Sequence, residues 1–119
     1  MKLFTSKDQT TKLIGVGFEK PKSEVKAENA GECAWYNPAY SIGELIEMLP
    51  TTIEHEIWWG KEKGMGGWWG LQISTNGTDF MWTVDYVRDH SAPLYGWDGS
   101  ELIDALFDAV ITLKEERVI

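Results

Sequence analysis

The sequence is short of the residues that protein chemistry most often uses. Its single cysteine, Cys33, allows no disulfide within the chain, so no oxidising compartment is needed. It has only two histidines, His55 and His90, and no apolar run long enough to cross a bilayer. The first residues lack the apolar core of a signal segment. We therefore expect a cytoplasmic protein that does not use a membrane.

Basic residues are also few. The 119 residues include 11 Lys and Arg against 19 Asp and Glu, which gives a net charge of −8 and a pI of about 4.7. An acidic chain is repelled by phosphate backbones, which argues against direct nucleic-acid binding. The charge is uneven, because residues 1–26 carry a net +3 and residues 27–119 a net −11. A basic arm on an acidic body indicates either a docking device or simply a solvated helix and linker.

Tryptophan, in contrast, is abundant, with 7 copies. Hydrophobic residues make up 43% of the chain and charged residues 25%, as in an ordinary globular protein. The length suits one domain over residues 1–119. A buried aromatic side chain removes roughly 150–250 Å² from water, so seven tryptophans can form a core or a binding surface.

Capping patterns predict two short helices. Ser41 begins an S-x-x-E capping box and an apolar pattern that predicts a helix over 42–49. A similar box at Thr5 predicts a helix over 6–15. The charged residues 19–34 between them lack apolar periodicity, so they are interpreted as a loop or tether.

The longest helix is predicted over 99–116, because apolar residues recur there at helical spacing over a broad arc. Such a helix lies across a sheet. Its other side carries an acidic stripe of Glu101, Asp104, Asp108 and Glu115. A stripe of this kind is usually a solvated face. It is also the feature on which an acidic decoy would depend, meaning a protein that occupies a nucleic-acid-binding site on a partner protein.

Three strands are predicted over 52–59, 68–75 and 78–87, where β-branched and aromatic residues alternate with polar ones. Asn76-Gly77 between the last two is the strongest short hairpin signal. The element order is then α-α-β-β-β-α. The expected fold class is α+β, with a three-stranded antiparallel meander whose apolar face is packed by the three helices.

The predicted hairpin register sorts the tryptophans between the two faces of this sheet. A two-residue turn pairs Thr75 with Thr78, and the apolar pairs that follow are Ile73 with Phe80, Leu71 with Trp82, and Trp69 with Val84. Neighbours in a strand point to opposite faces. Trp69 is therefore expected to point inward and Trp68 outward, and the same alternation turns Trp58 outward.

These outward tryptophans lie on both sides of a glycine-rich connection. Trp58 and Trp68, with Gly64, Met65 and Gly66 between them, are candidates for a binding surface. Such a surface suits a partner protein, or a small ligand such as a glycan, nucleotide or peptide that stacks on indole rings. The alternative is that another part of the chain covers both rings.

No grouping of residues predicts a reaction, a cofactor or a metal. His55 lies between two glutamates, but strand neighbours point to opposite faces. Asp85, Asp89 and His90 have the loose spacing that is common by chance. Cys33 has no histidine near it in the sequence. An enzyme with a histidine–carboxylate site is therefore the third hypothesis, after an interaction protein and a ligand-binding domain.

Segments 11–23, 40–50 and 101–107, with the aromatic strands between them, span most of the chain. In this order they resemble a group of short, uncharacterised proteins encoded by prophages and mobile elements of gut bacteria. The resemblance implies a small accessory protein and not an enzyme, and it carries over no functional residue. The leading expectation is a non-enzymatic interaction protein of this type, whose partner is a protein.

Overall fold

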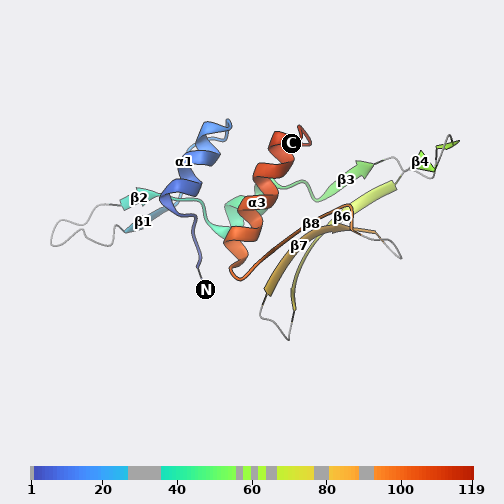
Figure 1. Ribbon diagram of the computed structural model, residues 1–119. Helices are drawn as coiled ribbons and strands as arrows, with labels where there is room; N and C mark the ends of the chain where they lie inside the picture. The colour runs from blue at the N-terminus through green and yellow to red at the C-terminus, as the bar shows by residue number, and fades with distance from the viewer. Residues whose placement is uncertain are drawn as a thin grey trace.

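The computed structural model describes residues 2–26, 36–55, 58–59, 62–63, 67–76, 81–88 and 93–119. They form an α+β fold in which helices lie to one side of a curled, four-stranded antiparallel sheet (Figure 1). The helices are α1 (Lys7–Gly15), α2 (Ile42–Met48) and α3 (Leu102–Glu115). The sheet contains β3 (Thr52–His55), β6 (Gly67–Asn76), β7 (Met81–Val87) and β8 (Tyr95–Gly99). Two small antiparallel pairs are β1 (Glu24–Lys26) with β2 (Tyr36–Pro38), and β4 (Trp58–Trp59) with β5 (Glu62–Lys63).

The α+β class is confirmed, whereas the predicted three-stranded meander is incomplete. The strand order is β3-β6-β7-β8. The fourth strand, β8, lies where the sequence predicts a loop and the start of the last helix. Its two glycines and an aspartate are poor strand formers, so only the alternation of Tyr95 with Trp97 indicates it. As a result α3 begins at Leu102 and not at residue 99.

Other predicted boundaries also change. The strand predicted over 52–59 belongs to the sheet only as far as His55, and β4 pairs with β5 instead of β6. Part of the predicted tether at 19–34 forms β1, which pairs with β2. The predicted helices over 6–15 and 42–49 are confirmed to within one residue at either end.

The prediction of a two-residue turn at Asn76-Gly77 is wrong. β6 continues to Asn76, which lies opposite Met81, so four residues separate the two strands. The observed register pairs Ile73 with Val84, a shift of four residues from the predicted pairing. An even shift leaves every side chain on its predicted face, because the side-chain period of a strand is two.

Both short helices begin after a serine whose side chain caps the helix. In α2, Ser41 and Glu44 form the predicted capping box, each side chain accepting a hydrogen bond from the other residue's backbone N–H. In α1 the cap is Ser6 and not Thr5. Ser6 Oγ accepts from the backbone N–H of Gln9, whose side chain accepts from Ser6 N in return.

Thr5 has a different role, which only the tertiary structure shows. Its side chain is buried, and its Oγ1 lies 2.7 Å from Thr10 Oγ1. The same oxygen accepts a hydrogen bond from Tyr40 N at 2.9 Å. Thr5 therefore fastens the N-terminal segment to the residues that precede α2.

Helix α3 connects the sheet to the other helices. It packs on β7 and β8 and also contacts α2. Leu106 and Leu113 of α3 and Val84 and Tyr86 of β7 are fully buried in one hydrophobic core, as the broad apolar arc predicts. Where β8 passes into α3 the chain is tight, because a Cβ on Gly99 would lie 3.1 Å from the Glu101 carbonyl oxygen.

The molecule is thin and long. Its principal extents are 65 × 36 × 17 Å, and the radius of gyration is 17.1 Å, whereas a compact chain of this length has one of about 13.5 Å. In Figure 1 the helices and the sheet lie side by side along the long axis. No helix in the described ranges has the length and apolar character needed to span a membrane.

Candidate functional site

Trp68 is the most exposed large hydrophobic side chain among the described residues, with 62% of its surface accessible. It lies near the start of β6, opposite Glu54 of β3. Its neighbour Trp69 is only 4% exposed and belongs to the core. The predicted inward and outward directions of these two tryptophans are therefore confirmed, and Trp68 lies on the outer face of the sheet, turned away from α3.

Next to Trp68 on the outer face of β6 is a glycine, which has no side chain. Gly70 is two residues further along β6, on the same face. Among the described residues, a Cβ built on Gly70 comes within 4 Å of one atom, the Val87 carbonyl oxygen at 4.0 Å. Trp68 and Gly70 thus lie two positions apart on the outer face of β6, and we call this pair of residues the shelf. Strand alternation predicts that Trp68 and Gly70 share the outer face, and the structure adds that Trp68 is exposed there.

Several predicted site residues stay untested. The backbone of Trp58 lies in β4, opposite Lys63 of β5, but its side chain is not described. Also outside the described residues or side chains are Gly64, Met65, Gly66, Cys33, His55, Asp89 and His90. Of the predicted binding surface, the structure therefore describes the side chain of Trp68, and the part formed by Trp58 and the glycine-rich connection stays a prediction.

The acidic residues of α3 do not form one free stripe. The backbone N–H of Lys2 donates to Glu101 Oε2 at 2.8 Å, and Lys2 Nζ lies 3.1 Å from Asp104 Oδ1. Gln9 of α1 donates to the same Asp104 oxygen at 2.8 Å. The basic N-terminal segment therefore docks on the acidic helix of its own chain, a contact that the sequence shows only as a charge imbalance.

The rest of the stripe, Asp108 and Glu115, is exposed. Partial burial and the neighbouring Asp104 carboxylate raise the pKa of Asp108, while Lys12 of α1 acts in the opposite direction. Like charges one helical turn apart destabilise a helix slightly. An acidic decoy surface on α3 would accordingly consist of these two carboxylates.

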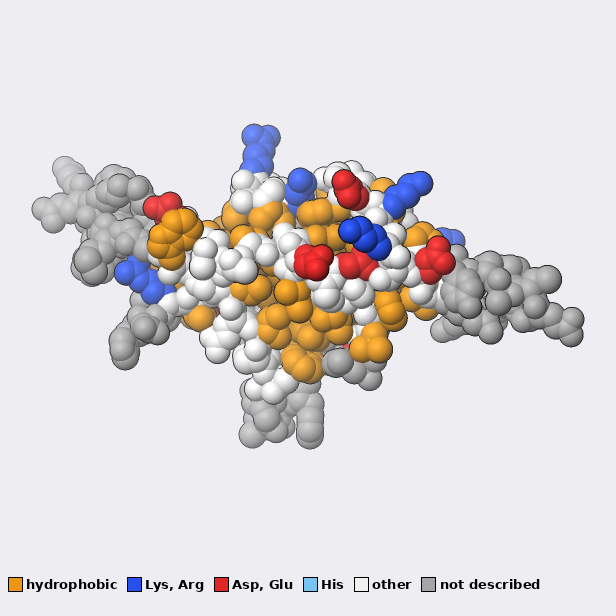
Figure 2. All heavy atoms as spheres, turned by 180° about the vertical axis from the view of Figure 1, so that it is seen from behind, with side chains coloured by type: hydrophobic (Ala, Val, Ile, Leu, Met, Phe, Trp, Pro, Cys, Tyr) orange, Lys and Arg blue, Asp and Glu red, His pale blue; other side chains and the backbone are white. Residues whose placement is uncertain are grey.

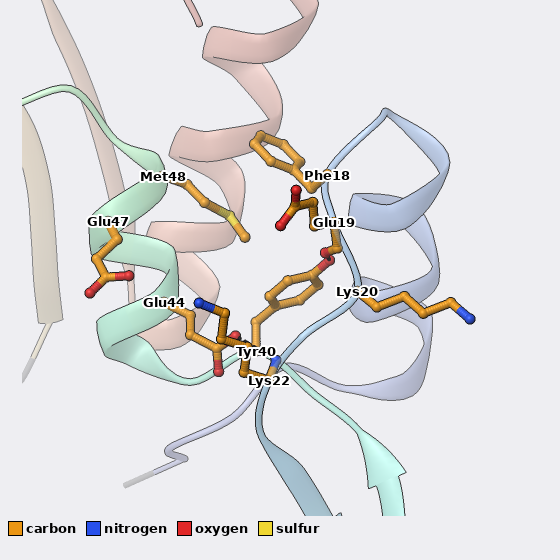
Figure 3. Close-up of a pocket in the computed structure, with 8 residues that line it drawn as sticks. All are labelled: Phe18, Glu19, Lys20, Lys22, Tyr40, Glu44, Glu47 and Met48. Atoms are coloured by element: carbon orange, nitrogen blue, oxygen red, sulfur yellow. Dashed lines mark hydrogen bonds between the residues drawn. The ribbon is translucent and has the colours of Figure 1, made fainter.

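A cleft of about 240 Å³ lies between the residues that follow α1 and one side of α2 (Figure 3). Phe18 and Met48 line its apolar end, and Tyr40 forms its floor. The side chains of Lys20 and Glu47 point away from it. Small-molecule sites usually have volumes of about 300–1,000 Å³, so this cleft is small for one.

Two polar side chains of the cleft, Tyr40 and Glu44, are engaged in contacts that hold the fold. The Tyr40 hydroxyl donates to the Glu19 carbonyl oxygen. Glu44 accepts from Ser23 Oγ and from Lys22 N as well as capping α2. Burial acts to raise the pKa of Glu44, but these hydrogen bonds outweigh it and leave the pKa below its ordinary value. Both side chains therefore hold the segment that follows α1 against the start of α2.

Asp85 of β7 is a further perturbed carboxyl group on the outer face. Its burial, and then the nearby Asp98, raise its pKa. Its Oδ1 is buried and has no hydrogen-bond partner in the described part of the chain. Asp98 accepts a hydrogen bond from Thr83 Oγ1 at 2.9 Å. Within the described ranges, no three His, Cys, Asp or Glu side chains are grouped to hold a metal ion.

Comparisons with protein-family models, with curated proteins and with solved structures found no match to this chain. The resemblance to prophage and mobile-element proteins therefore stays a prediction. What can be argued about function comes from the Trp68 shelf, the acidic helix and the sheet itself.

Proposed function

We propose that this chain is a non-enzymatic interaction protein that binds another protein through the shelf of Trp68 and Gly70. The observation that carries the proposal is the 62% exposure of this one tryptophan, whereas the other tryptophans whose side chains the structure describes, Trp69, Trp82 and Trp97, lie on the inner face and are buried or half-buried. Exposed indole surface is costly in water, and tryptophan is the residue most enriched among the hot spots of protein interfaces.

The surroundings of Trp68 indicate the chemistry of the partner. Glu54 lies directly across from it on β3 and is exposed. Gly70 leaves space beside the ring for an apolar side chain. A partner that places an apolar group on the shelf and a basic group at its rim fits this pattern. The net charge of −8 favours a basic protein over nucleic acid.

This function agrees with the small accessory protein, of phage or mobile-element type, that the resemblance implies. The decoy form of the hypothesis adds a second contact through Asp108 and Glu115, the carboxylates of α3 that are exposed. The engagement of Tyr40 and Glu44 in structural hydrogen bonds supports a binding role over a catalytic one.

Affinity capture from a lysate of the source cells tests the proposal with two variants of the same strand. Trp68→Ser removes the indole ring, and Gln72→Ser changes another exposed residue on the same face. The wild type and Gln72→Ser should recover the same specific protein, and Trp68→Ser should weaken its binding by about 30-fold or more, as expected for a hot spot. Equal recovery by both variants, or no specific partner at all, contradicts the proposal.

A small-ligand site is the second candidate, and the absence of a side chain at Gly70 is the observation that favours it. A flat ring can stack on Trp68 over bare backbone. Titration of tryptophan fluorescence with glycans, nucleotides and peptides tests this directly. A change with one class that disappears in Trp68→Ser supports the ligand site, and no change with any class eliminates it.

A further inference from the structure

Strand β3 lies at an edge of the main sheet. Among the described strands it pairs with β6 alone, whereas β6 and β7 each have two neighbours. Leu71 N donates to the Thr51 carbonyl oxygen at 2.9 Å, which shows the side to which the backbone groups of this short strand point. In an antiparallel pair the bonding residues alternate, so Ile53 bonds to β6, while the N–H and C=O groups of Thr52 and Glu54 point to the open edge. The open edge of β3 therefore carries backbone donors and acceptors that β6 does not use.

A cavity of about 360 Å³ lies along this open edge. It is lined by residues 52–54 of β3, by Pro50, by Tyr95 of β8 and by Val118, which follows α3. Three consecutive residues of a strand can line one cavity only at the edge of the strand, because neighbouring side chains point to opposite faces. The volume lies within the range of about 300–1,000 Å³ that is usual for binding sites. The edge of β3 therefore combines unused backbone groups with space for an apolar side chain, which are the two features that an added strand requires.

The charge on the outer face of β3 indicates a basic occupant for this edge. Glu54 is exposed, and it has no ion-pair partner among the described residues. Figure 2 shows the Lys and Arg side chains gathered mainly over the helices, so the sheet end of this view is poor in basic groups. A second copy of the chain is a poor occupant, because two chains of net charge −8 repel each other.

We infer that the partner protein binds by strand addition, with an extended basic segment of the partner paired to the open edge of β3. A partner residue across from Glu54 bonds to its backbone and points its side chain to the outer face, where Lys or Arg pairs with the carboxylate. Trp68 lies on the other side of Glu54, two strand spacings or about 10 Å from that partner residue and within reach of a long side chain. The next partner residue points into the cavity beside Ile53, so it is apolar. The inference rests on the proposed function, whose site it extends from Trp68 to the edge of β3.

A synthetic peptide of alternating lysine and valine, acetyl-Lys-Val-Lys-Val-Lys-amide, is the probe, and isothermal titration calorimetry measures its binding. It should bind at least about 10-fold more tightly than the peptide in which glutamate replaces lysine. N-methylation then separates strand addition from attraction between charges, because it removes a hydrogen-bond donor and keeps the charge. The lysine amides face β3 in the added strand and the valine amides face away. Methylation of the lysine amides should abolish binding, whereas methylation of the valine amides should leave the dissociation constant within about threefold.

Two variants at Thr52 test the same contact from the side of the protein. Thr52→Pro removes the N–H that faces the open edge and leaves the hydrogen bonds to β6, and proline is tolerated at the first residue of a strand. Thr52→Val keeps this N–H at the same exposed position. Thr52→Pro should weaken binding of the lysine peptide by about 10-fold or more, and Thr52→Val should bind it as the wild type does. Circular dichroism verifies that both variants fold, and the methylated peptides test the wild type if one of them does not.

Three results would overturn strand addition: equal binding of the two methylated peptides, equal binding by the two Thr52 variants, or no binding of the lysine peptide at up to about 1 mM. The proposed function fails separately. A captured partner that Trp68→Ser weakens and Thr52→Pro does not affect would keep the Trp68 site and contradict strand addition. Peptide binding as expected, with equal capture by Trp68→Ser and Gln72→Ser, would support the edge of β3 and contradict the proposed role of Trp68.

Discussion

The buried hydroxyl of Tyr86 should make the fold sensitive to alkaline pH. Tyr86 lies in the core with no exposed surface, and its hydroxyl donates to the Pro50 carbonyl oxygen at 2.7 Å. Burial raises its pKa from 10.0 to about 12. Between these two values the unfolded chain has released the proton and the folded chain still holds it. The free energy of unfolding should therefore fall by about 1.4 kcal/mol per pH unit, or roughly 2.7 kcal/mol in all.

A comparison of the wild type with Tyr86→Phe isolates the effect of the Tyr86 hydroxyl, because the other tyrosines are present in both proteins. At neutral pH the variant should be less stable by about 1 kcal/mol, the usual net value of one hydrogen bond. Since the variant has no proton to lose at this position, the two stabilities should become equal near pH 11, and the variant should be the more stable above it.

Urea unfolding followed by tryptophan fluorescence, repeated from about pH 7 to about pH 11.5, measures both stabilities. The diagnostic quantity is the difference between the wild type and the variant. If this difference stays constant over the whole range, the Tyr86 hydroxyl is not held protonated by burial and the reasoning is refuted.

Two further variants test the ties at the helix ends. Ser41→Ala removes the hydroxyl that caps α2 and should lower the free energy of unfolding in urea by about 1 kcal/mol. Replacing the exposed Thr11 with Ala should change this free energy little. Equal losses in the two variants would contradict the role of the Ser41 cap. Lys2→Met removes the ion pair with Asp104, whose two side chains are 37% and 43% exposed. Its cost should be below about 1 kcal/mol and should vanish near 1 M salt, and a loss that persists there would show that packing, not charge, holds the segment.

The strand faces show which features of this fold can be predicted from sequence. Side-chain alternation is a property of the strand alone, so Trp68 and Trp69 are assigned correctly although the predicted register is four residues out. Register depends on the connection between strands, and Asn76-Gly77 resembles a two-residue turn while β6 continues through Asn76. The fourth strand is missed because its glycines and aspartate suggest a loop, and only its pairing with β7 makes Tyr95–Gly99 a strand.

The residues of the candidate site also include some that the sequence identifies and some that only the tertiary structure brings together. Composition and alternation identify Trp68, because an outward tryptophan on a half-polar strand can be recognised without tertiary information. The docking of Lys2 on Asp104, in contrast, joins residues whose proximity no local pattern encodes. For Lys2 and Asp104 the separation along the chain is 102 residues, so only the packed structure could bring them together.

The sequence by itself determined the class of fold, the helices and the faces of the strands, since each depends on side chains a few residues apart. The tertiary structure decided the strand register, the fourth strand and the fate of the surfaces. The acidic stripe is partly occupied by the chain's own N-terminal segment, while Trp68 remains exposed. Whether a surface is covered depends on which distant segments pack against it, and that is a property of the whole fold.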